Sequence, residues 1–309
     1  MSNYAGKFIP DDSNNPWNKA FDLIGKGAKV LDVGCSNGKF AEALIHFKSC
    51  IVDGVEPDKG DATKAKKIMR TVATSFMEQA LDNEFKREQY DSIVFLDVIE
   101  HLYEPAQALR ALHDHLKPGG NIIFSIPNMA HASVRIMLLG GDFNYGNTGL
   151  LDNTHLHFYT RDEIIGVFSE AGFNVNKWDA TEAVYTKEVL KVELKKIGIS
   201  KPTQELLDIL SNNDAKIFQY IGSAQAGKSV KKDRPHYSPN PQGAITSYYE
   251  QHAKDVQMEL QRLNEGALNY EKQVRDLTVS LLEKEKLMSE MTLAKHIRRS
   301  VRARIKGKK

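Results

Sequence analysis

The stretch "VLDVGCSNGKF", residues 30–40, joins a short apolar run to a turn and then to residues with helical spacing. The run predicts a buried strand ending at Asp32–Val33, and the turn extends from Gly34 to Gly38. A strand, a turn and a helix in this order place the turn at the carboxyl edge of a parallel sheet, where such folds bind ligands. Glycines in the turn let a ligand approach the backbone closely.

A second stretch, "VDGVEPD", supports a nucleoside ligand. It ends a predicted strand at Glu56, about 20 residues after the turn, where a carboxylate can accept both hydroxyls of a ribose. Pro57 and Asp58 then begin a helix. A dinucleotide site requires G-x-G-x-x-G for the pyrophosphate, and the turn from Gly34 to Gly38 has the wrong spacing for it.

Strand and helix signals alternate through the first two thirds of the chain. This alternation predicts a parallel sheet with helices on both faces. Two later segments, "NVNKWDATEA" and "AKIFQYIGSAQ", alternate in the manner of an antiparallel terminal pair, and a helical insertion at about 185–212 lies between them. The five preceding strands are predicted at 28–33, 51–55, 72–77, 92–96 and 121–126.

Composition restricts the class of protein. The 309 residues are 41% hydrophobic, which is enough for a sizeable core, and the formal net charge is only +2. Two cysteines, Cys35 and Cys50, argue against a disulfide framework, so we expect a reducing compartment and a cytoplasmic protein. No apolar run reaches about 18 residues, which predicts that the chain does not span a membrane.

The last third has a different organisation. Residues 226–248 contain three prolines and few large apolar side chains, which predicts a linker. Residues 249–292 then have apolar side chains at alternating spacings of four and three, the pattern of a coiled coil. We expect a homo-oligomer, as a parallel dimer or trimer; the alternative is a helix that packs back on its own domain. The apolar positions are Tyr249, Ala253, Val256, Leu260, Leu263, Ala267, Tyr270, Val274, Leu277, Leu281, Met288 and Met291, with Lys284 interrupting them.

Residues 293–309 form a basic amphipathic tail. Eight Lys or Arg side chains and no acid follow Met291, and an apolar stripe repeats every four residues from Leu293 to Ile305. This pattern favours binding to an anionic membrane surface, which would make the protein peripheral on the inner face of the cytoplasmic membrane. A solvated tail is the alternative, and nucleic acid is the least favoured partner.

Four stretches together carry a family resemblance: "VLDVGCSNGKF", "VDGVEPD", "YDSIVFLDVIEHL" and "LKPGGNIIFSIPN". In this order and spacing, residues 28–225 resemble the class I S-adenosylmethionine-dependent methyltransferases. The resemblance implies an α/β fold for residues 1–225: a Rossmann-like seven-stranded sheet with helices on both faces, followed by the long C-terminal coiled-coil helix. It also implies S-adenosylmethionine as cofactor.

The resemblance assigns cofactor-binding roles residue by residue. Asp32 would face the methionine ammonium, and Glu56, followed by Pro57, would hold the ribose. The backbone at Asp97 would border the methionine portion; the alternative for Asp97 is a helix cap. The turn residues Gly34, Cys35 and Gly38 would let the cofactor lie across them, and Ser75 and Phe76 would contact the adenine.

Ser36 is a departure from the family turn, which usually has a third glycine at this position. A serine serves there if its backbone is not left-handed, and its hydroxyl would add a contact.

The stretch "DVIEHL" also matches an array that related ubiquinone-pathway O-methyltransferases use for a divalent metal. Asp97, Glu100 and His101 would be the ligands. The other interpretation makes His101 a wall of the site near the transferred methyl group.

Methyl transfer to a hydroxyl requires an aligned nucleophile and removal of its proton. Asp152, His155, His157 and Tyr159 lie within eight residues, and an extended backbone would put His155, His157 and Tyr159 on one face. His155 is therefore the predicted base, with Asp152 beside it. The alternative is an edge segment whose histidines bond to the backbone, followed by a Thr160–Glu163 capping box.

The segment "FNYGNTGLLDNTHLHFYTRDEI" is similar to a subgroup of methyltransferases of bacterial surface-polysaccharide (O-antigen) assembly. This implies a sugar hydroxyl or a terminal phosphate as acceptor, on a lipid-linked glycan whose end would be capped, with a glycosyltransferase as partner. Asn144, Tyr145, Asn153 and Tyr159 are available for sugar recognition. Two alternatives stay open: a quinone or small-phenol O-methyltransferase, and a catalytically inert scaffold that recruits glycan-assembly enzymes.

Overall fold

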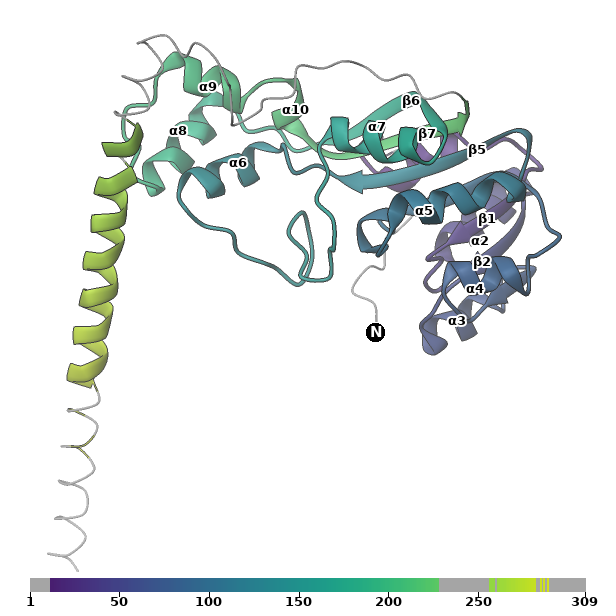
Figure 1. The fold of residues 1–309 in the computed structure, drawn as a ribbon, viewed down its shortest axis with the longest axis horizontal. Coiled ribbons are helices and arrows are strands. Elements are labelled where there is room, and N and C mark those ends of the chain that lie inside the picture. Colours follow the sequence, from purple (N-terminus) through teal and green to yellow (C-terminus); the bar gives the residue numbers. More distant parts are fainter. Residues whose placement is uncertain are drawn as a thin grey trace, which may run out of the picture. The chain divides into compact units, whose positions relative to one another are not determined.

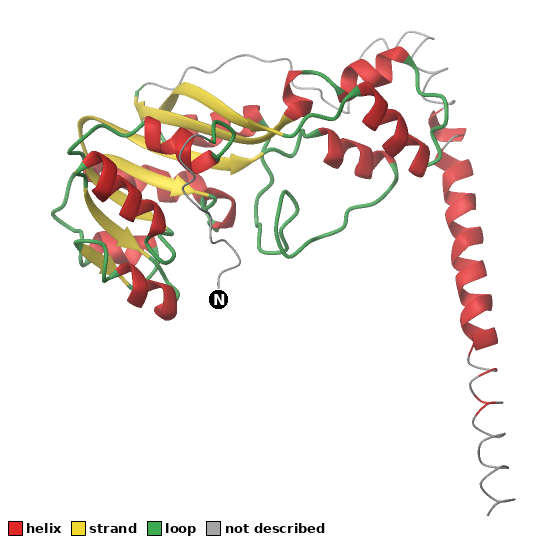
Figure 2. Cartoon of the chain, turned by 180° about the vertical axis from the view of Figure 1, so that it is seen from behind, coloured by secondary structure: helices red, strands yellow, loops and turns green. Residues whose placement is uncertain are grey.

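The computed structural model describes residues 12–227, 256–258, 260–281, 284, 286 and 288 (Figures 1 and 2). The chain divides into two units, residues 1–232 and residues 233–309. The first unit is built on one seven-stranded sheet in the order β3-β2-β1-β4-β5-β7-β6. Its strands are β1 (Lys29–Val33), β2 (Ile51–Val55), β3 (Thr71–Ala73), β4 (Tyr90–Leu96), β5 (Leu116–Pro127), β6 (Phe173–Glu182) and β7 (Ile217–Ala226).

The pairing confirms the predicted mixed sheet. β1 to β5 are parallel, and β7 pairs antiparallel with both β5 and β6. The third strand is shorter than the predicted 72–77: it ends at Ala73, and Met77 already begins α4 (Met77–Asp82). The change of direction at β7 leaves the carboxyl ends of the five parallel strands along one edge.

Successive residues of the central strands pack into different apolar clusters. Val30 and Val94 belong to one cluster, while Leu31 and Ile93 belong to the other, and all four are fully buried. One cluster includes residues of α4, α5 (Pro105–Arg110) and α7 (Arg161–Glu170). The other includes residues of α1 (Pro16–Asp22), α2 (Lys39–Lys48) and α3 (Lys59–Ala65). The sheet is therefore covered by helices on both faces.

A smaller apolar cluster joins four further helices at the β6–β7 end of the unit (Figure 1). α6 (Ala132–Leu139) follows β5, whereas α8 (Lys187–Lys196), α9 (Gln204–Leu210) and α10 (Asn213–Lys216) lie between β6 and β7. Leu190, Leu194 and Leu207 are buried among these helices. Thr186 and Thr203 each accept a hydrogen bond from the first turn of α8 or α9, which fixes where the helices begin.

In the second unit, residues 256–258 and 260–281 are helical. The seam residues of this helix are exposed, so the coiled coil stays a prediction. Several predicted features lie outside the described residues. They are most of the linker, the seam positions Tyr249, Ala253 and Met291, and the basic tail 293–309. Among the residues that are described, no helix combines the length and hydropathy of a membrane span.

Candidate active site

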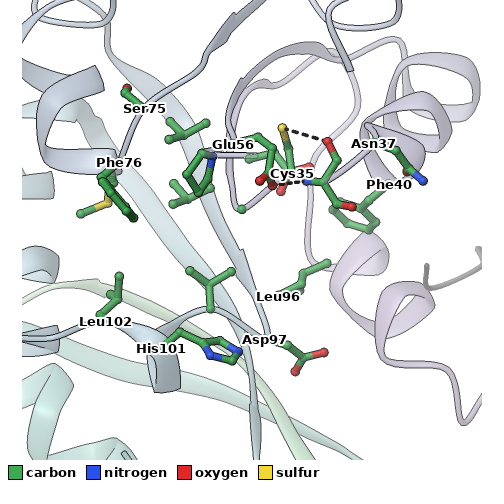
Figure 3. A pocket seen from close by; sticks show the side chains of 18 of the residues that line it. Cys35, Asn37, Phe40, Glu56, Ser75, Phe76, Leu96, Asp97, His101 and Leu102 are labelled. Atoms are coloured by element: carbon green, nitrogen blue, oxygen red, sulfur yellow. Dashed lines mark hydrogen bonds between the residues drawn. The ribbon is translucent and has the colours of Figure 1, made fainter. Parts of the chain in front are cut away.

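A cavity of about 460 Å³ lies at the carboxyl edge of the parallel strands (Figure 3). Cavities of this size bind small molecules and cofactors. Its wall is made by residues that follow four neighbouring strands and by one turn of helix. They are Asp32 to Asn37 at the end of β1 and in the turn after it, Glu56 and Pro57 after β2, Ser75 to Glu78 after β3, Asp97 and Val98 after β4, and His101 and Leu102 at the end of η1 (Ile99–His101).

The turn after β1 is held against β2. The backbone N–H groups of Gly34 and Cys35 donate to the carbonyl of Val55, at 2.8 and 3.1 Å. Gly34 has φ +72°, and a Cβ atom there would lie 2.6 Å from a methyl group of Val98, so the position requires glycine. Gly38 has φ +81° and begins α2 as its N-cap.

Ser36 differs from the expectation for it, because its backbone is left-handed with φ +46°. The serine is accepted because its N–H donates to Glu56 Oε2 at 2.9 Å, which fixes the strained conformation. Its hydroxyl lies 3.5 Å from Asp61 Oδ2, so the side chain does add a contact. The Cys35 thiol is buried, and burial raises its pKa, so it is an inert packing group.

Two carboxylates face this turn without a cationic partner. Asp32 is 3% exposed and its Oδ2 has no hydrogen-bond donor. Burial, assisted by the charge of Glu56, raises the pKa of Asp32 to about 7. Glu56 accepts one backbone N–H on each oxygen, from Ser36 and Asp58, and burial raises its pKa despite these bonds. An ammonium group and a diol are the partners that such carboxylates lack.

The predicted adenine contacts, Ser75 and Phe76, both line the cavity (Figure 3). The Ser75 hydroxyl is buried without a partner, and the Phe76 side chain is 66% exposed. A flat apolar ring beside an unused hydroxyl suits an aromatic base. Asn15, Pro16 and Trp17 also line the cavity, although they were not among the predicted cofactor contacts. The sequence does mark this helix start, because Asn15 is a typical N-cap residue and Pro16 is favoured at the first helical position.

Asp97 is not a helix cap, since Val98 is the N-cap residue of η1. It has a left-handed backbone, φ +57°, and its Oδ1 accepts hydrogen bonds from Ser125 and Gln219. Burial raises the pKa of Asp97 to about 6, although both hydrogen bonds oppose the shift. Ser125 and Gln219 belong to β5 and β7 and carried no sequence signal, because their role depends on strand pairing.

The structure brings together two of the three predicted metal ligands, Glu100 and His101, and adds His155 to them. Glu100, His101 and His155 each place one possible ligand atom within 4.8 Å of the others, and Asp97 is not part of this group. Glu100 is 1% exposed and neither of its carboxyl oxygens has a hydrogen-bond partner. Burial and the charge of Asp97 raise the pKa of Glu100.

His101 lines the cavity, whereas His155 does not and instead contacts the His101 ring. The two rings are 4.9 Å apart edge to face, and His155 Nε2 is 4.0 Å from Glu100 Oε1. A carbonyl can only accept, so the contacts of His101 Nδ1 with the Thr154 carbonyl and of His155 Nδ1 with the Leu150 carbonyl place a proton on each Nδ1. Burial and the neighbouring His101 lower the pKa of His155 and keep it neutral.

The segment around His155 is not the extended strand that would align His155, His157 and Tyr159. The N–H groups of Leu156 and His157 both donate to the Glu100 carbonyl, which breaks the alternation. His155 and Tyr159 are buried, but His157 is half-buried and contacts the Tyr103 carbonyl.

Asp152 is buried but outside the cavity wall, and its Oδ1 accepts from the N–H and hydroxyl of Thr154, so its visible role is to order the turn. The Thr160–Glu163 capping box of α7 is present.

Comparison with known proteins identifies the family of this chain. The sequence profile described as a methyltransferase domain matches residues 15–177. The chain belongs to this family. S-adenosylmethionine is the cofactor that family membership assigns to the cavity. A SAM dependent methyltransferase from Archaeoglobus fulgidus aligns with a TM-score of 0.46 at 17% identity, over 67% of this chain and 90% of that chain.

Curated relatives are named ubiquinone biosynthesis O-methyltransferase. The one from Pseudomonas entomophila (strain L48) is 29% identical over 128 residues, which cover 38% of this chain and 52% of the relative. The one from Aeromonas salmonicida (strain A449) is 25% identical over 180 residues, 55% of this chain and 74% of the relative. The chain thus spans about half the length of the Pseudomonas relatives it matches.

Proposed function

We propose that the protein transfers a methyl group from S-adenosylmethionine to a hydroxyl of a phenol or quinol. Family membership supports methyl transfer, and the names of the curated relatives support O-methylation of this acceptor class. The observation that carries the proposal is the position of His101. It is a cavity-lining imidazole whose tautomer is fixed by the Thr154 carbonyl, beside the buried Glu100 and His155.

Each cofactor-binding residue would contact a different part of S-adenosylmethionine. The unpartnered Oδ2 of Asp32 would accept the methionine ammonium, and Glu56 would accept the ribose hydroxyls with the lone pairs that Ser36 and Asp58 leave unused. Phe76 would cover the adenine ring. When bound, the cofactor supplies a methyl group on a positively charged sulfur, which is already a strong electrophile.

The remaining task is to remove the proton of the acceptor. His101 is the residue we assign to it, because its Nε2 is the acceptor nitrogen of a ring that faces the cavity. His155, the base predicted from sequence, instead packs behind His101 and holds its orientation. Glu100 lies next to both rings, where a carboxylate would stabilise the imidazolium that forms.

The same three residues also suit a divalent cation. Glu100, His101 and His155 would hold it, since the two unpartnered Glu100 oxygens and two imidazole nitrogens are a reasonable donor set. Such an ion would lower the pKa of a bound hydroxyl. Turnover measured before and after treatment with a chelator, and after addition of Mg²⁺, Mn²⁺ or Zn²⁺, separates this role from that of an unaided His101.

A sugar hydroxyl is the second candidate acceptor. Phe143 and Tyr145 are 40% and 56% exposed and contact the Phe158 ring, which lies 6.4 Å from His155. Exposed rings of this kind stack on sugars as well as on phenols. The lipid-linked glycan and the glycosyltransferase partner remain predictions. The inert scaffold is disfavoured because every predicted cofactor-binding residue except Gly38 lines the cavity.

The proposal is tested by incubating the protein with cofactor labelled in its methyl group, together with either a catechol-type phenol or a lipid-linked glycan fraction. We expect label in the phenol. His101→Ala should lower kcat about 10²–10⁴-fold with unchanged cofactor affinity, while the matched control His157→Ala should retain activity. Label confined to the glycan would select the second candidate, and no transfer to either would refute the proposal.

A further inference from the structure

The helix of the second unit presents an apolar stripe without a covering partner among its described residues. Its seam positions recur at spacings of three and four, and the large side chains at these positions are at least 49% exposed. From 256 to 281 the stripe is about 39 Å long at 1.5 Å per residue. The seam residues are Val256, Leu260, Leu263, Ala267, Tyr270, Val274, Leu277 and Leu281.

The stripe is not uniform, and its centre decides how it pairs. Ala267 and Tyr270 are adjacent seam positions, so a very small side chain is followed by a large one. In a parallel, in-register pair each seam residue faces its own copy. Ala267 would then face Ala267 across a gap, and Tyr270 would face Tyr270 in the next, crowded layer. Both gaps and overpacking destabilise such interfaces.

We propose that the helix pairs with a second copy of itself in an antiparallel orientation. A two-fold axis between positions 268 and 269 places Tyr270 opposite Ala267 of the other copy, and the same contact recurs by symmetry. The rotation also pairs Leu263 with Val274. Further out it pairs Leu260 with Leu277 and Val256 with Leu281, so the stripe is matched along its whole described length. Each layer then combines side chains that fill the space between the helices.

The flanking residues are compatible with this arrangement. Gly266 precedes Ala267 and allows the helices to approach closely at the axis. The one opposing feature is Glu271, which would lie near its own copy across the axis. It is exposed, so its repulsion is weakened by water, and Arg275 stands four residues further along the helix, a spacing that allows an intrahelical ion pair. The apolar layers therefore determine the orientation.

Disulfide cross-linking of the full-length protein tests the orientation. Single variants Val256→Cys and Leu281→Cys are each oxidised alone and as a mixture, with the wild type as control because its two native cysteines are buried. In the antiparallel pair, identical positions are about 37 Å apart along the axis, far beyond disulfide reach, whereas 256 faces 281. We expect a cross-linked dimer from the mixture and none from either variant alone.

Sedimentation equilibrium with a second variant completes the test. Ala267→Leu would clash with Tyr270 of the other copy, so we expect the dimer dissociation constant to rise at least tenfold. In a parallel pair the same substitution fills the gap and tightens the dimer. A monomeric wild type, cross-linking of either single variant alone, or a dimer that no cysteine pair captures would overturn the proposal. None of these results depends on the proposed enzymatic function.

Discussion

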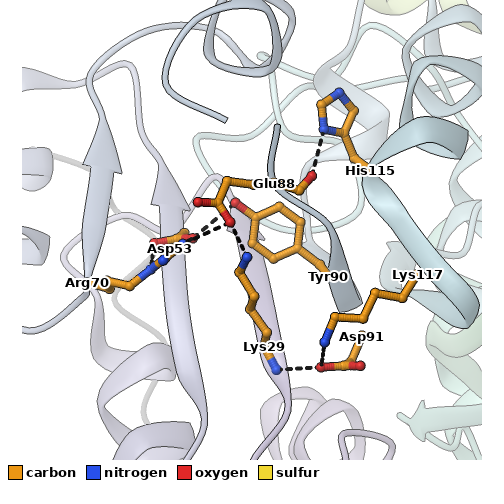
Figure 4. Close-up of polar contacts among 8 residues, drawn as sticks. All are labelled: Lys29, Asp53, Arg70, Glu88, Tyr90, Asp91, His115 and Lys117. Carbon is orange, nitrogen blue, oxygen red and sulfur yellow. Dashed lines mark hydrogen bonds and ion pairs between the residues drawn. The ribbon is translucent and has the colours of Figure 1, made fainter. Parts of the chain in front are cut away.

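The carboxylates at the two edges of the parallel sheet differ in whether they have cationic partners. At the carboxyl edge, Asp32, Glu56 and Glu100 are buried and have no cationic partner, and burial raises the pKa of each. Near the amino ends of the strands, a network of polar side chains pairs every carboxylate it contains (Figure 4). This amino-edge network consists of Lys29, Asp53, Arg70, Glu88, Tyr90, Asp91 and Lys117.

The pairing in the amino-edge network is dense. Asp53 is fully buried, accepts a two-point contact from Arg70, and accepts the Tyr90 hydroxyl at 3.0 Å. A hydrogen bond from Lys29 lowers the pKa of Glu88. Buried charge that is paired belongs to the fold, whereas buried charge that lacks a partner points to a ligand. The comparison therefore marks the carboxyl edge as the functional one without reference to any relative.

The largest expected effect comes from removing a cation of the amino-edge network. Arg70→Ala would leave the Asp53 carboxylate buried with only the Tyr90 hydroxyl as side-chain partner. We expect a loss of about 3 kcal/mol in the free energy of unfolding, measured with urea. Lys39→Ala, which removes an exposed ion pair with Glu42, is the control and should change stability by less than about 1 kcal/mol. Equal effects of the two variants would remove the distinction between the edges.

The opposite result is expected for a carboxylate of the cavity. Asp32→Asn removes a buried charge without a partner, so the free protein should gain about 1 kcal/mol in stability at pH 8. Cofactor affinity should fall about 10–100-fold, because a charge-assisted contact is lost. Calorimetry and urea unfolding measure both quantities. Asp91→Asn at the amino edge is the matched control, and it should destabilise the fold without changing cofactor affinity.

The two edges should also differ in their response to pH. The pKa of Asp32 is about 7 in the fold and 3.8 in an unperturbed chain, so the folded protein binds this proton more tightly. Its effect on stability is thus an unfavourable term that grows as the pH rises from about 4 to 7. The pKa of Glu88 is lowered below 4.5, so its favourable term is present above 4.5 and is lost as the pH falls through the folded value.

Cofactor binding reports the same titration. Because the ammonium requires an ionised carboxylate, we expect affinity to fall as the pH decreases through about 7. Below this pH the free protein carries a proton on Asp32, and cofactor binding releases that proton. Titrations in buffers of different ionisation enthalpy detect that proton. An affinity independent of pH between 6 and 8 would contradict the role of Asp32.

The smallest effect concerns the strained turn. Ser36→Gly removes the penalty of a left-handed backbone, φ +46°, and should raise the free energy of unfolding by about 1 kcal/mol. Cofactor affinity should change little, since the Ser36 N–H that binds Glu56 is retained. Lower stability would mean that the hydroxyl contact with Asp61 outweighs the strain.

The local sequence pattern was sufficient to predict the strands that carry the site. The apolar runs predicted the strands, and the spacing of the turn and Glu56 predicted which edge of the sheet holds a ligand, because parallel strands align their carboxyl ends. The hairpin signal likewise predicted the antiparallel β6–β7 pair.

Contacts between distant residues were beyond such reasoning. The left-handed conformation of Ser36 depends on its bond to Glu56, and the burial of His155 depends on the Glu100 carbonyl, which receives two N–H groups from the loop. The alternation of that loop suggested an extended strand, but the chain bends at Leu156, where these bonds are made. The pairing of Asp53 with Arg70 is equally invisible in sequence, although it decides which edge is structural.

The central claim is that two carboxylates without cationic partners at the carboxyl edge, Asp32 and Glu56, bind the cofactor. Isothermal titration of S-adenosylmethionine into the wild type, Glu56→Ala and Arg70→Ala tests it most directly, with each variant studied at a temperature where it is folded. The account predicts one site per chain in the wild type, at least tenfold weaker binding in Glu56→Ala, and unchanged binding in Arg70→Ala. No binding by the wild type, or equal binding by Glu56→Ala, would contradict it.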